Sequence, residues 1–219
     1  MKLTQTIFQQ EGPIWESFCQ HPFVCGIGTG ELDQQIFCHY MIQDYLYLLD
    51  YAKVFALGVV KAQDEETMRF YANLVRDTLD GEMHVHKGYM ERLGITPGQV
   101  SQAKPTLENL AYTNYMLWVA NNEGILPLTI AVLACSWSYA VIAPLLIQQH
   151  PGAQDHPFYG EWVRSYASPA YQESNQQILD LVDRLGANCS SQETAHLLEI
   201  CHNCTEFERL FWDMAQRGR

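Results

Sequence analysis

Residues 41–56, MIQDYLYLLDYAKVFA, decide the fold because their apolar positions repeat at helical spacing. In a helix, Phe37, Met41, Asp44, Leu48 and Tyr51 fall three or four residues apart and line one face. All but Asp44 are apolar or aromatic, so this face should pack inward, with Gln43 and Lys53 on the solvent side. A buried carboxylate needs a partner or a ligand. The stretch therefore predicts a long buried helix whose carboxylate has something to bind.

Helical periodicity runs through the rest of the chain, and no run of alternating strand pattern interrupts it. Asp64 is placed to cap a helix, Gly94, Gly124 and Gly186 are placed to end helices, and Pro127 fits a first turn. Pro97 and Pro105 bracket a predicted loop. No linker or repeat divides the 219 residues. The sequence predicts one all-α domain over residues 1–219, with helices at 4–20, 32–62, 65–93, 107–123, 127–149, 156–167, 170–186 and 191–216.

The segment 126–147 is long enough and apolar enough to cross a membrane. The nearest flanking charges, Glu123 and Asp155, are both acidic, which is not the pattern of a membrane-spanning helix. We therefore predict a helix buried at the centre of a bundle.

The formal net charge of −12 and the absence of any basic cluster argue against nucleic acid and anionic membranes as partners. The seven cysteines are an odd number and lie in apolar contexts, which favours reduced thiols and a cytoplasmic location. Cys201 and Cys204 form one CxxC motif. Without a second pair, two core positions on a helix are a better interpretation than a zinc site.

Other predicted helices also carry polar residues on apolar faces. Glu208 lies between Cys204 and Phe211, and Cys135 shares a face with Tyr139. Any one of these residues alone would fit a buried hydrogen bond to a phenol or a histidine. Inward polar groups from separate helices, flanked by tyrosines and by no Lys or Arg, favour a shared polar pocket instead.

Glu82 and His86 lie one turn apart on a face that Val75, Leu79 and Leu93 also share. An acid and a histidine at this spacing can ligate a metal. We favour a Glu82–His86 hydrogen bond behind the pocket, because the inward carboxylates are too few for two irons.

The chemistry of such a pocket follows from its groups. A carboxylate without a cation suits an amidine-like edge, in which a ring nitrogen lies beside an exocyclic amino group. Aromatic side chains suit a flat heterocycle. A cysteine supplies a nucleophile, and a carboxylic acid can deliver a proton.

Six segments, taken in order, resemble the TenA (thiaminase II) family: HPFVCGIGTGEL, FCHYMIQDYLYLLDYA, EMHVHKGYMERLGI, ACSWSYAVIAPLL, YGEWVRSYASPAY and FERLFWDMA. The resemblance runs from about residue 20 to the end of the chain. It implies the all-α, haem-oxygenase-like bundle without haem. It also implies hydrolysis of aminopyrimidines in thiamin salvage, usually of 4-amino-5-aminomethyl-2-methylpyrimidine, with weaker cleavage of thiamin.

The resemblance also assigns residues. Cys135 matches the nucleophile, Asp44 the carboxylate that holds the amino edge, and Glu208 the acid beside the opposite ring nitrogen. Ser138 stands where many members have Gly, which would narrow the space behind the ring. Glu82 and His86 are expected behind the pocket. The remaining pocket residues are Tyr47, Tyr112, Tyr139, Tyr166 and Phe211, of which Tyr47 and Tyr166 are expected to orient the thiol.

No metal or cofactor is expected for this reaction, and the family suggests a homotetramer. Two other functions stay open at this point. One is a metal-dependent oxidase on the same scaffold, and the other is a pyrimidine-binding regulator without turnover. The intact Cys135 and Glu208 argue against the second of these.

Overall fold

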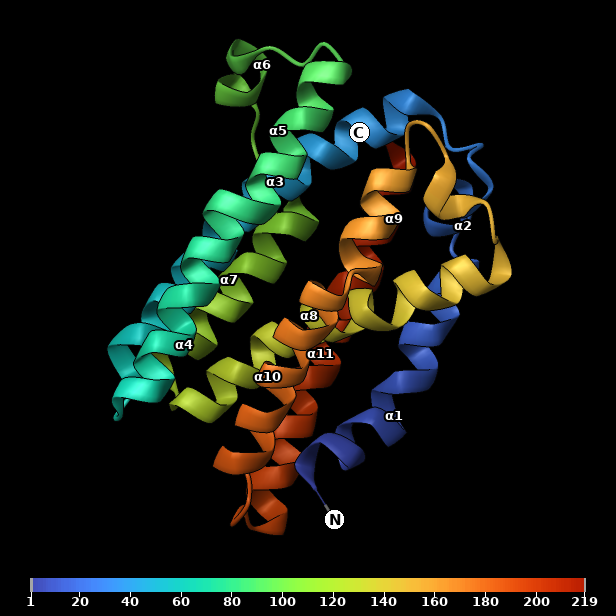
Figure 1. The fold of residues 1–219 in the computed structure, drawn as a ribbon. Coiled ribbons are helices and arrows are strands. Elements are labelled where there is room, and N and C mark those ends of the chain that lie inside the picture. Colours follow the sequence, from blue (N-terminus) through green and yellow to red (C-terminus); the bar gives the residue numbers. More distant parts are fainter. Residues whose placement is uncertain (1, 219) are drawn as a thin grey trace. The chain divides into compact units, whose positions relative to one another are not determined.

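The computed structural model describes residues 2–218, and every regular element in that range is a helix, as predicted. Figure 1 shows the course of the chain. The elements are α1 (Leu3–Ser17), η1 (Phe18–Gln20), α2 (Pro22–Thr29), α3 (Gln34–Lys61), α4 (Glu65–Arg76), η2 (Asp77–Glu82), α5 (Met83–Arg92), α6 (Pro97–Gln102), α7 (Leu107–Asn122), α8 (Ile125–Gln149), η3 (Ala153–Asp155), α9 (Gly160–Ala167), α10 (Pro169–Leu185) and α11 (Ser191–Arg217).

The chain divides into two compact units. The first unit runs to Leu32 and resumes over Thr129–Trp212, and the second comprises Asp33–Leu128 and the residues from Asp213 on. The helices α8 and α11 each have residues in both units. The predicted single domain stays a prediction.

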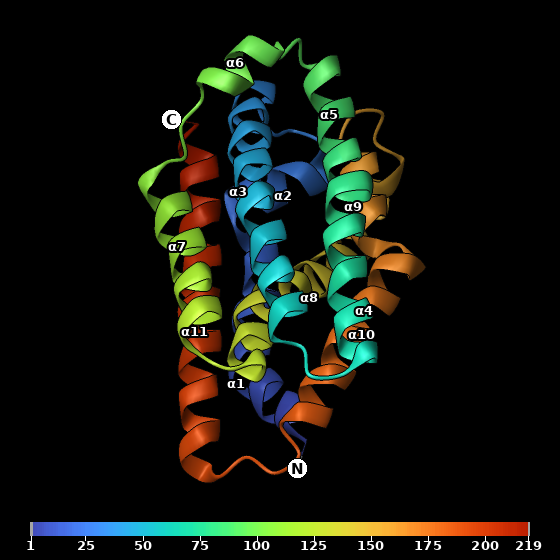
Figure 2. The ribbon, with the colours of Figure 1, turned by 90° about the vertical axis from the view of Figure 1, so that its left-hand side faces the viewer.

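In the second unit, α3 packs against α4, α5 and α7, and Figure 2 shows it between α7 and the α4–α5 segment. The helix begins at Asp33, whose carboxylate accepts a hydrogen bond from the Gln35 amide at 2.7 Å. Phe37, Met41 and Leu48 are at most 2% exposed, so the predicted inward face is confirmed.

The predicted helix over residues 65–93 is interrupted by a π turn, η2. Asp64 caps its first part, as predicted, by accepting from the Thr67 amide at 2.8 Å. A π turn adds a residue to the helical step, so the buried positions go from Thr78 to Met83 rather than four residues on. The prediction that Leu79 faces inward was therefore wrong, and its side chain is 40% exposed.

Two short helices were missed by the sequence interpretation. Helix α2 begins with His21 as cap and Pro22 in its first turn, and it ends at Gly30, which has a φ of 79°. Helix α6 lies inside the predicted loop and begins with a capping box of Thr96 and Gln99. Both are too short for periodicity to reveal.

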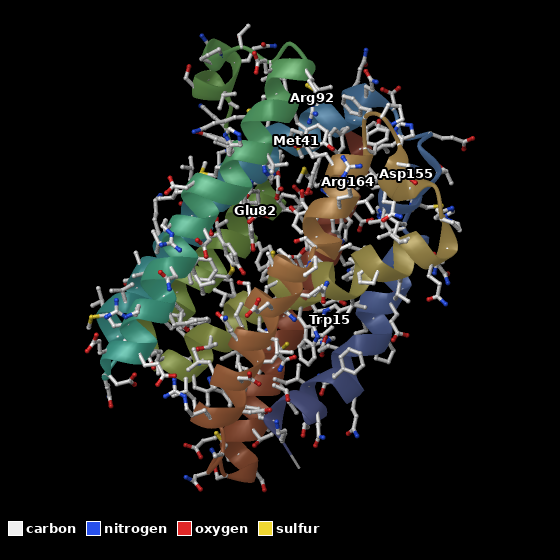
Figure 3. The ribbon with its side chains drawn as sticks, viewed as in Figure 1. Trp15, Met41, Glu82, Arg92, Asp155 and Arg164 are labelled. Carbon is white, nitrogen blue, oxygen red and sulfur yellow. The ribbon has the colours of Figure 1, made fainter. Side chains whose placement is uncertain are left out.

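In the first unit, α10 packs against α1 and α9, and the apolar helix α8 is largely buried. Helix α8 has the length and composition of a membrane span, but such burial is also typical of the core helix of a soluble protein. Trp15 of α1, labelled in Figure 3, lies 5.1 Å from the Trp137 ring of α8. The Trp15 indole nitrogen donates to the Thr205 hydroxyl of α11 at 3.0 Å. The two contacts of Trp15 thus join α1, α8 and α11.

Candidate active site

The residues predicted to form the site are distributed over both units. The second unit carries Asp44, Tyr47, Glu82, His86 and Tyr112, and the first unit carries Cys135, Tyr139, Tyr166, Glu208 and Phe211. In the second unit, Asp44 contacts His86 and Tyr47 contacts Tyr112. In the first unit, Tyr139 contacts Tyr166. That the two sets act on one substrate stays a prediction.

Asp44 and His86 form a direct buried contact in the second unit. The Nε2 of His86 lies 2.6 Å from Oδ2 of Asp44, and the two side chains are 2% and 7% exposed respectively. The other ring nitrogen, Nδ1, lies 2.9 Å from the backbone carbonyl oxygen of Glu82, the residue labelled at the end of the π turn in Figure 3. The ring of His86 thus contacts the backbone of Glu82 through Nδ1 and the carboxylate of Asp44 through Nε2.

The acidic neighbours of His86 raise the pKa of its ring. Burial alone would lower the pKa of His86, but the hydrogen bond and charge of Asp44, together with Glu82, raise it above the ordinary value of 6.5. The partner that a buried carboxylate needs is therefore, for Asp44, the side chain of His86.

Aromatic rings continue the α3 face beside Asp44. The ring of Tyr47 stacks on Tyr51 at 5.3 Å and lies 5.2 Å from Tyr112 of α7. The Tyr47 hydroxyl donates to the sulfur of Met116 at 3.8 Å. Tyr47 and Tyr112 are at most 3% exposed, which confirms that both face inward.

The sequence interpretation missed a polar clamp next to Asp44. It placed Gln43 on the solvent side, which was wrong, because the side chain is 4% exposed. Its Oε1 accepts from the Thr106 amide at 3.0 Å, and its Nε2 donates to the Lys104 carbonyl at 3.0 Å. Asn109 of α7 donates to the Gln43 carbonyl at 2.8 Å. The clamp fixes the start of α7 against α3, but a lone glutamine beside a carboxylate gives no signal of this in the sequence.

In the first unit, Cys135 is a half-buried residue of α8. The fully buried Ser138 donates its hydroxyl to the Cys135 carbonyl at 2.9 Å, so the hydroxyl bonds back to its own helix. Glu208 of α11 is 2% exposed. Burial, then the charges of Cys201 and Glu208, raise the pKa of Cys204 well above 9.0.

The predicted aromatic residues of the first unit form a cluster of rings. Tyr139 of α8 lies 4.5 Å from the Tyr166 ring of α9 and 5.3 Å from the Trp212 ring of α11. Trp162 completes the cluster at 4.9 Å from Tyr166. Phe211 beside Trp212 is 3% exposed. Aromatic rings from three distant segments therefore lie together within one unit.

Among residues 2–218, no group of three or more His, Cys, Asp or Glu side chains could hold a metal ion. Cys201 and Cys204 are both fully buried in α11, which agrees with the interpretation as core positions. Burial and the charge of Glu11 raise the pKa of Cys201 well above 9.0.

The sequence is similar to a known protein family and to named members of it. The model of the TENA/THI-4/PQQC family matches residues 8–218. The chain belongs to this family. An aminopyrimidine aminohydrolase of Helicobacter pylori is 46% identical over 218 residues, covering 100% of both chains. An enzyme of the same name from Halalkalibacterium halodurans is 42% identical over 219 residues, covering 100% of this chain and 97% of the relative.

Solved structures of other proteins share the fold. A TenA family transcription regulator from a Silicibacter species has a TM-score of 0.89 at 28% identity, and 98% of this chain and 96% of that chain are covered. A protein of Shewanella denitrificans with a heme oxygenase-like fold has a TM-score of 0.77 at 16% identity, with coverage of 99% and 93%. The predicted haem-oxygenase-like fold is confirmed.

Proposed function

We propose that the protein is an aminopyrimidine aminohydrolase of thiamin salvage. The observation that carries the proposal is its identity of 46% and 42%, over essentially full length, with two proteins of that name. The proposed substrate is 4-amino-5-aminomethyl-2-methylpyrimidine. Water replaces its aminomethyl nitrogen, giving the hydroxymethyl pyrimidine and ammonia.

In the proposed mechanism, Glu208 donates a proton or a hydrogen bond to a ring nitrogen, which makes the adjacent carbon electrophilic. The thiolate of Cys135 adds to that carbon, and the electrons of the ring expel the substrate's protonated amino group as ammonia from the exocyclic methylene. Water then adds to the methylene and gives up one proton to the released ammonia, the thiolate leaves, and the ring nitrogen returns its proton to Glu208. The buried position of Glu208 and the half-buried position of Cys135 suit these roles, since one side chain is shielded from water and the other is within reach of a small molecule.

Substrate recognition is assigned to Asp44 and to the rings. An oxygen of Asp44 accepts a hydrogen bond from the exocyclic amino group, and aromatic faces cover the heterocycle. Tyr47 and Tyr166 are proposed to orient the reacting groups. The lining side chains Tyr112, Tyr139 and Phe211 support this assignment by being at most 4% exposed and aromatic.

The experiment is an ammonia-release assay with the aminomethyl pyrimidine. Replacing Cys135 with Ser removes the nucleophile and should reduce turnover by more than about 10³-fold. Cys25→Ser is the matched control, because Cys25 is another half-buried helical thiol of the first unit and has no role in the proposal. Equal loss in both variants would point to a general effect of cysteine removal and would contradict the mechanism.

We also propose a cytoplasmic homotetramer. All seven cysteines are free thiols, which suits a reducing compartment. Val60 of α3 and Leu107 of α7 are 79% and 81% exposed, and Trp118 of α7 is 56% exposed. Large apolar side chains exposed on two neighbouring helices are typical of surfaces that other subunits cover.

A further inference from the structure

The Asp44–His86 pair holds a proton that the proposed mechanism does not use. The carbonyl oxygen of Glu82 can only accept a hydrogen bond, so the Nδ1 of His86, 2.9 Å away, must carry a hydrogen. The Nε2 then faces Oδ2 of Asp44 at 2.6 Å. Two lone pairs would repel at this distance, whereas charge-assisted hydrogen bonds are characteristically short. One further proton therefore lies between the ring and the carboxylate.

The position of this proton determines whether the other carboxylate oxygen of Asp44 can donate or only accept a hydrogen bond. Whether the proton lies on Nε2 or on Oδ2, the other oxygen, Oδ1, carries none. Oδ1 is then an acceptor and cannot donate. Because the pair is only 2% and 7% exposed, water does not readily exchange for either partner.

The surroundings of His86 within the second unit favour this state. The charged groups that act on it are Asp44 from α3 and Glu82 from η2, and both raise its pKa. On α3, Lys53 is bound to Asp50 at 2.6 Å instead. The buried phenols on the packed elements are those of Tyr40, Tyr47, Tyr51 and Tyr89. The other ionisable side chains of η2 and α5 are exposed, namely Asp77, Asp80, His84, Lys87, Glu91 and Arg92.

We propose that His86 keeps Asp44 in its acceptor form and thereby makes the protein select a 4-amino over a 4-oxo pyrimidine. The inference rests on the proposed function, in which Asp44 binds the amino edge. An amino group donates to Oδ1, whereas a carbonyl oxygen in the same place would meet another acceptor. Without His86 the buried carboxylate loses its cation and takes up a proton, so that it can also donate to an oxo group. His86 is thus a positioning residue that acts through Asp44.

The test is calorimetric binding of the reaction product, 4-amino-5-hydroxymethyl-2-methylpyrimidine, and of its 4-oxo counterpart between pH 5.5 and 9. His86→Gln retains a donor near Asp44 but no charge, and His86→Asn retains a donor near the Glu82 carbonyl but does not reach Asp44. Both variants should lose about tenfold to hundredfold of the amino-over-oxo preference, which is the worth of a hydrogen bond to a charged group.

The pH dependence separates this role from a structural one. In the wild type, Oδ1 of Asp44 is an acceptor on both sides of the raised pKa of His86, because loss of the shared proton leaves a carboxylate, so the preference should change little with pH. In His86→Gln the preference should instead rise with pH, as Asp44 loses its proton. The same preference and the same pH slope in wild type and both variants would overturn the proposal.

If the His86 variants fail to fold, a spectroscopic measurement on the wild-type protein still tests the proposal. In wild-type protein with ¹⁵N-labelled histidine, the proton between Nε2 of His86 and Oδ2 of Asp44 should give a strongly downfield ¹H resonance at pH 6.5, in addition to the proton on Nδ1, and its absence would overturn the proposal. If the wild type binds neither pyrimidine, the proposed function fails and the selectivity fails with it. The ring spectrum would still report whether the Asp44–His86 proton exists, so the two failures are distinguishable.

Discussion

Replacing Gly58 with Ala should destabilise the second unit, because α3 and α4 approach closely at this position. A Cβ atom built on Gly58 would lie under 3.0 Å from three ring atoms of Tyr71. The Tyr71 ring is 0% exposed and packs against Phe55 and Phe70, so it has no room to move away. Overpacking of this kind costs about 1–3 kcal/mol, and we take the upper end because the ring cannot yield.

The intrinsic helix preference of Ala offsets about 1 kcal/mol of that cost, leaving a net loss of about 2 kcal/mol. Gly88→Ala is the matched control: Gly88 lies within α5, and a Cβ there meets nothing within 4 Å. This variant should gain about 1 kcal/mol from the same preference. Urea unfolding followed by circular dichroism should show a lower midpoint for Gly58→Ala and a higher one for Gly88→Ala. A Gly58→Ala protein as stable as the control variant would refute the packing argument.

Two further predictions concern thiols and assembly. Because burial raises the pKa of Cys201 and Cys204 well above 9.0, iodoacetamide at pH 8 should leave both unmodified in the folded protein, as mass spectrometry can determine. Labelling of either at the rate of the half-buried Cys25 would contradict their placement. Light scattering should give about four times the chain mass of 25.1 kDa, and a Trp118→Asp variant should dissociate. A single-chain mass for the wild type would rule out the tetramer.

The inward face of α3 could be predicted from the sequence because it depends only on helical spacing. Phe37, Met41 and Leu48 are buried where the 3.6-residue period puts them, and Asp44 lies among them. The same helical period wrongly predicted that Leu79 faces inward. A π turn shifts every later residue by one position, and no residue type marks where it begins.

Contacts between helices could not be predicted in the same way. The sequence suggested Glu82 as the partner of His86 because the two lie one turn apart. The structure joins His86 to Asp44, which is 42 residues away, and this pairing depends on how α5 packs against α3. The prediction that Gln43 faces solvent was wrong for the same reason, because its burial depends on contacts with the start of α7 and not on its neighbours in the sequence. Residue types identified the candidate groups, but packing determined which of them meet.

The most direct test of the account is the rate at which the purified protein releases ammonia from 4-amino-5-aminomethyl-2-methylpyrimidine, with and without the thiol of Cys135. The account predicts steady release by the wild type and by Cys25→Ser, and a rate at least about 10³-fold lower for a folded Cys135→Ser protein. Near wild-type release by Cys135→Ser would contradict the covalent mechanism, and no release by the wild type would contradict the proposed function itself.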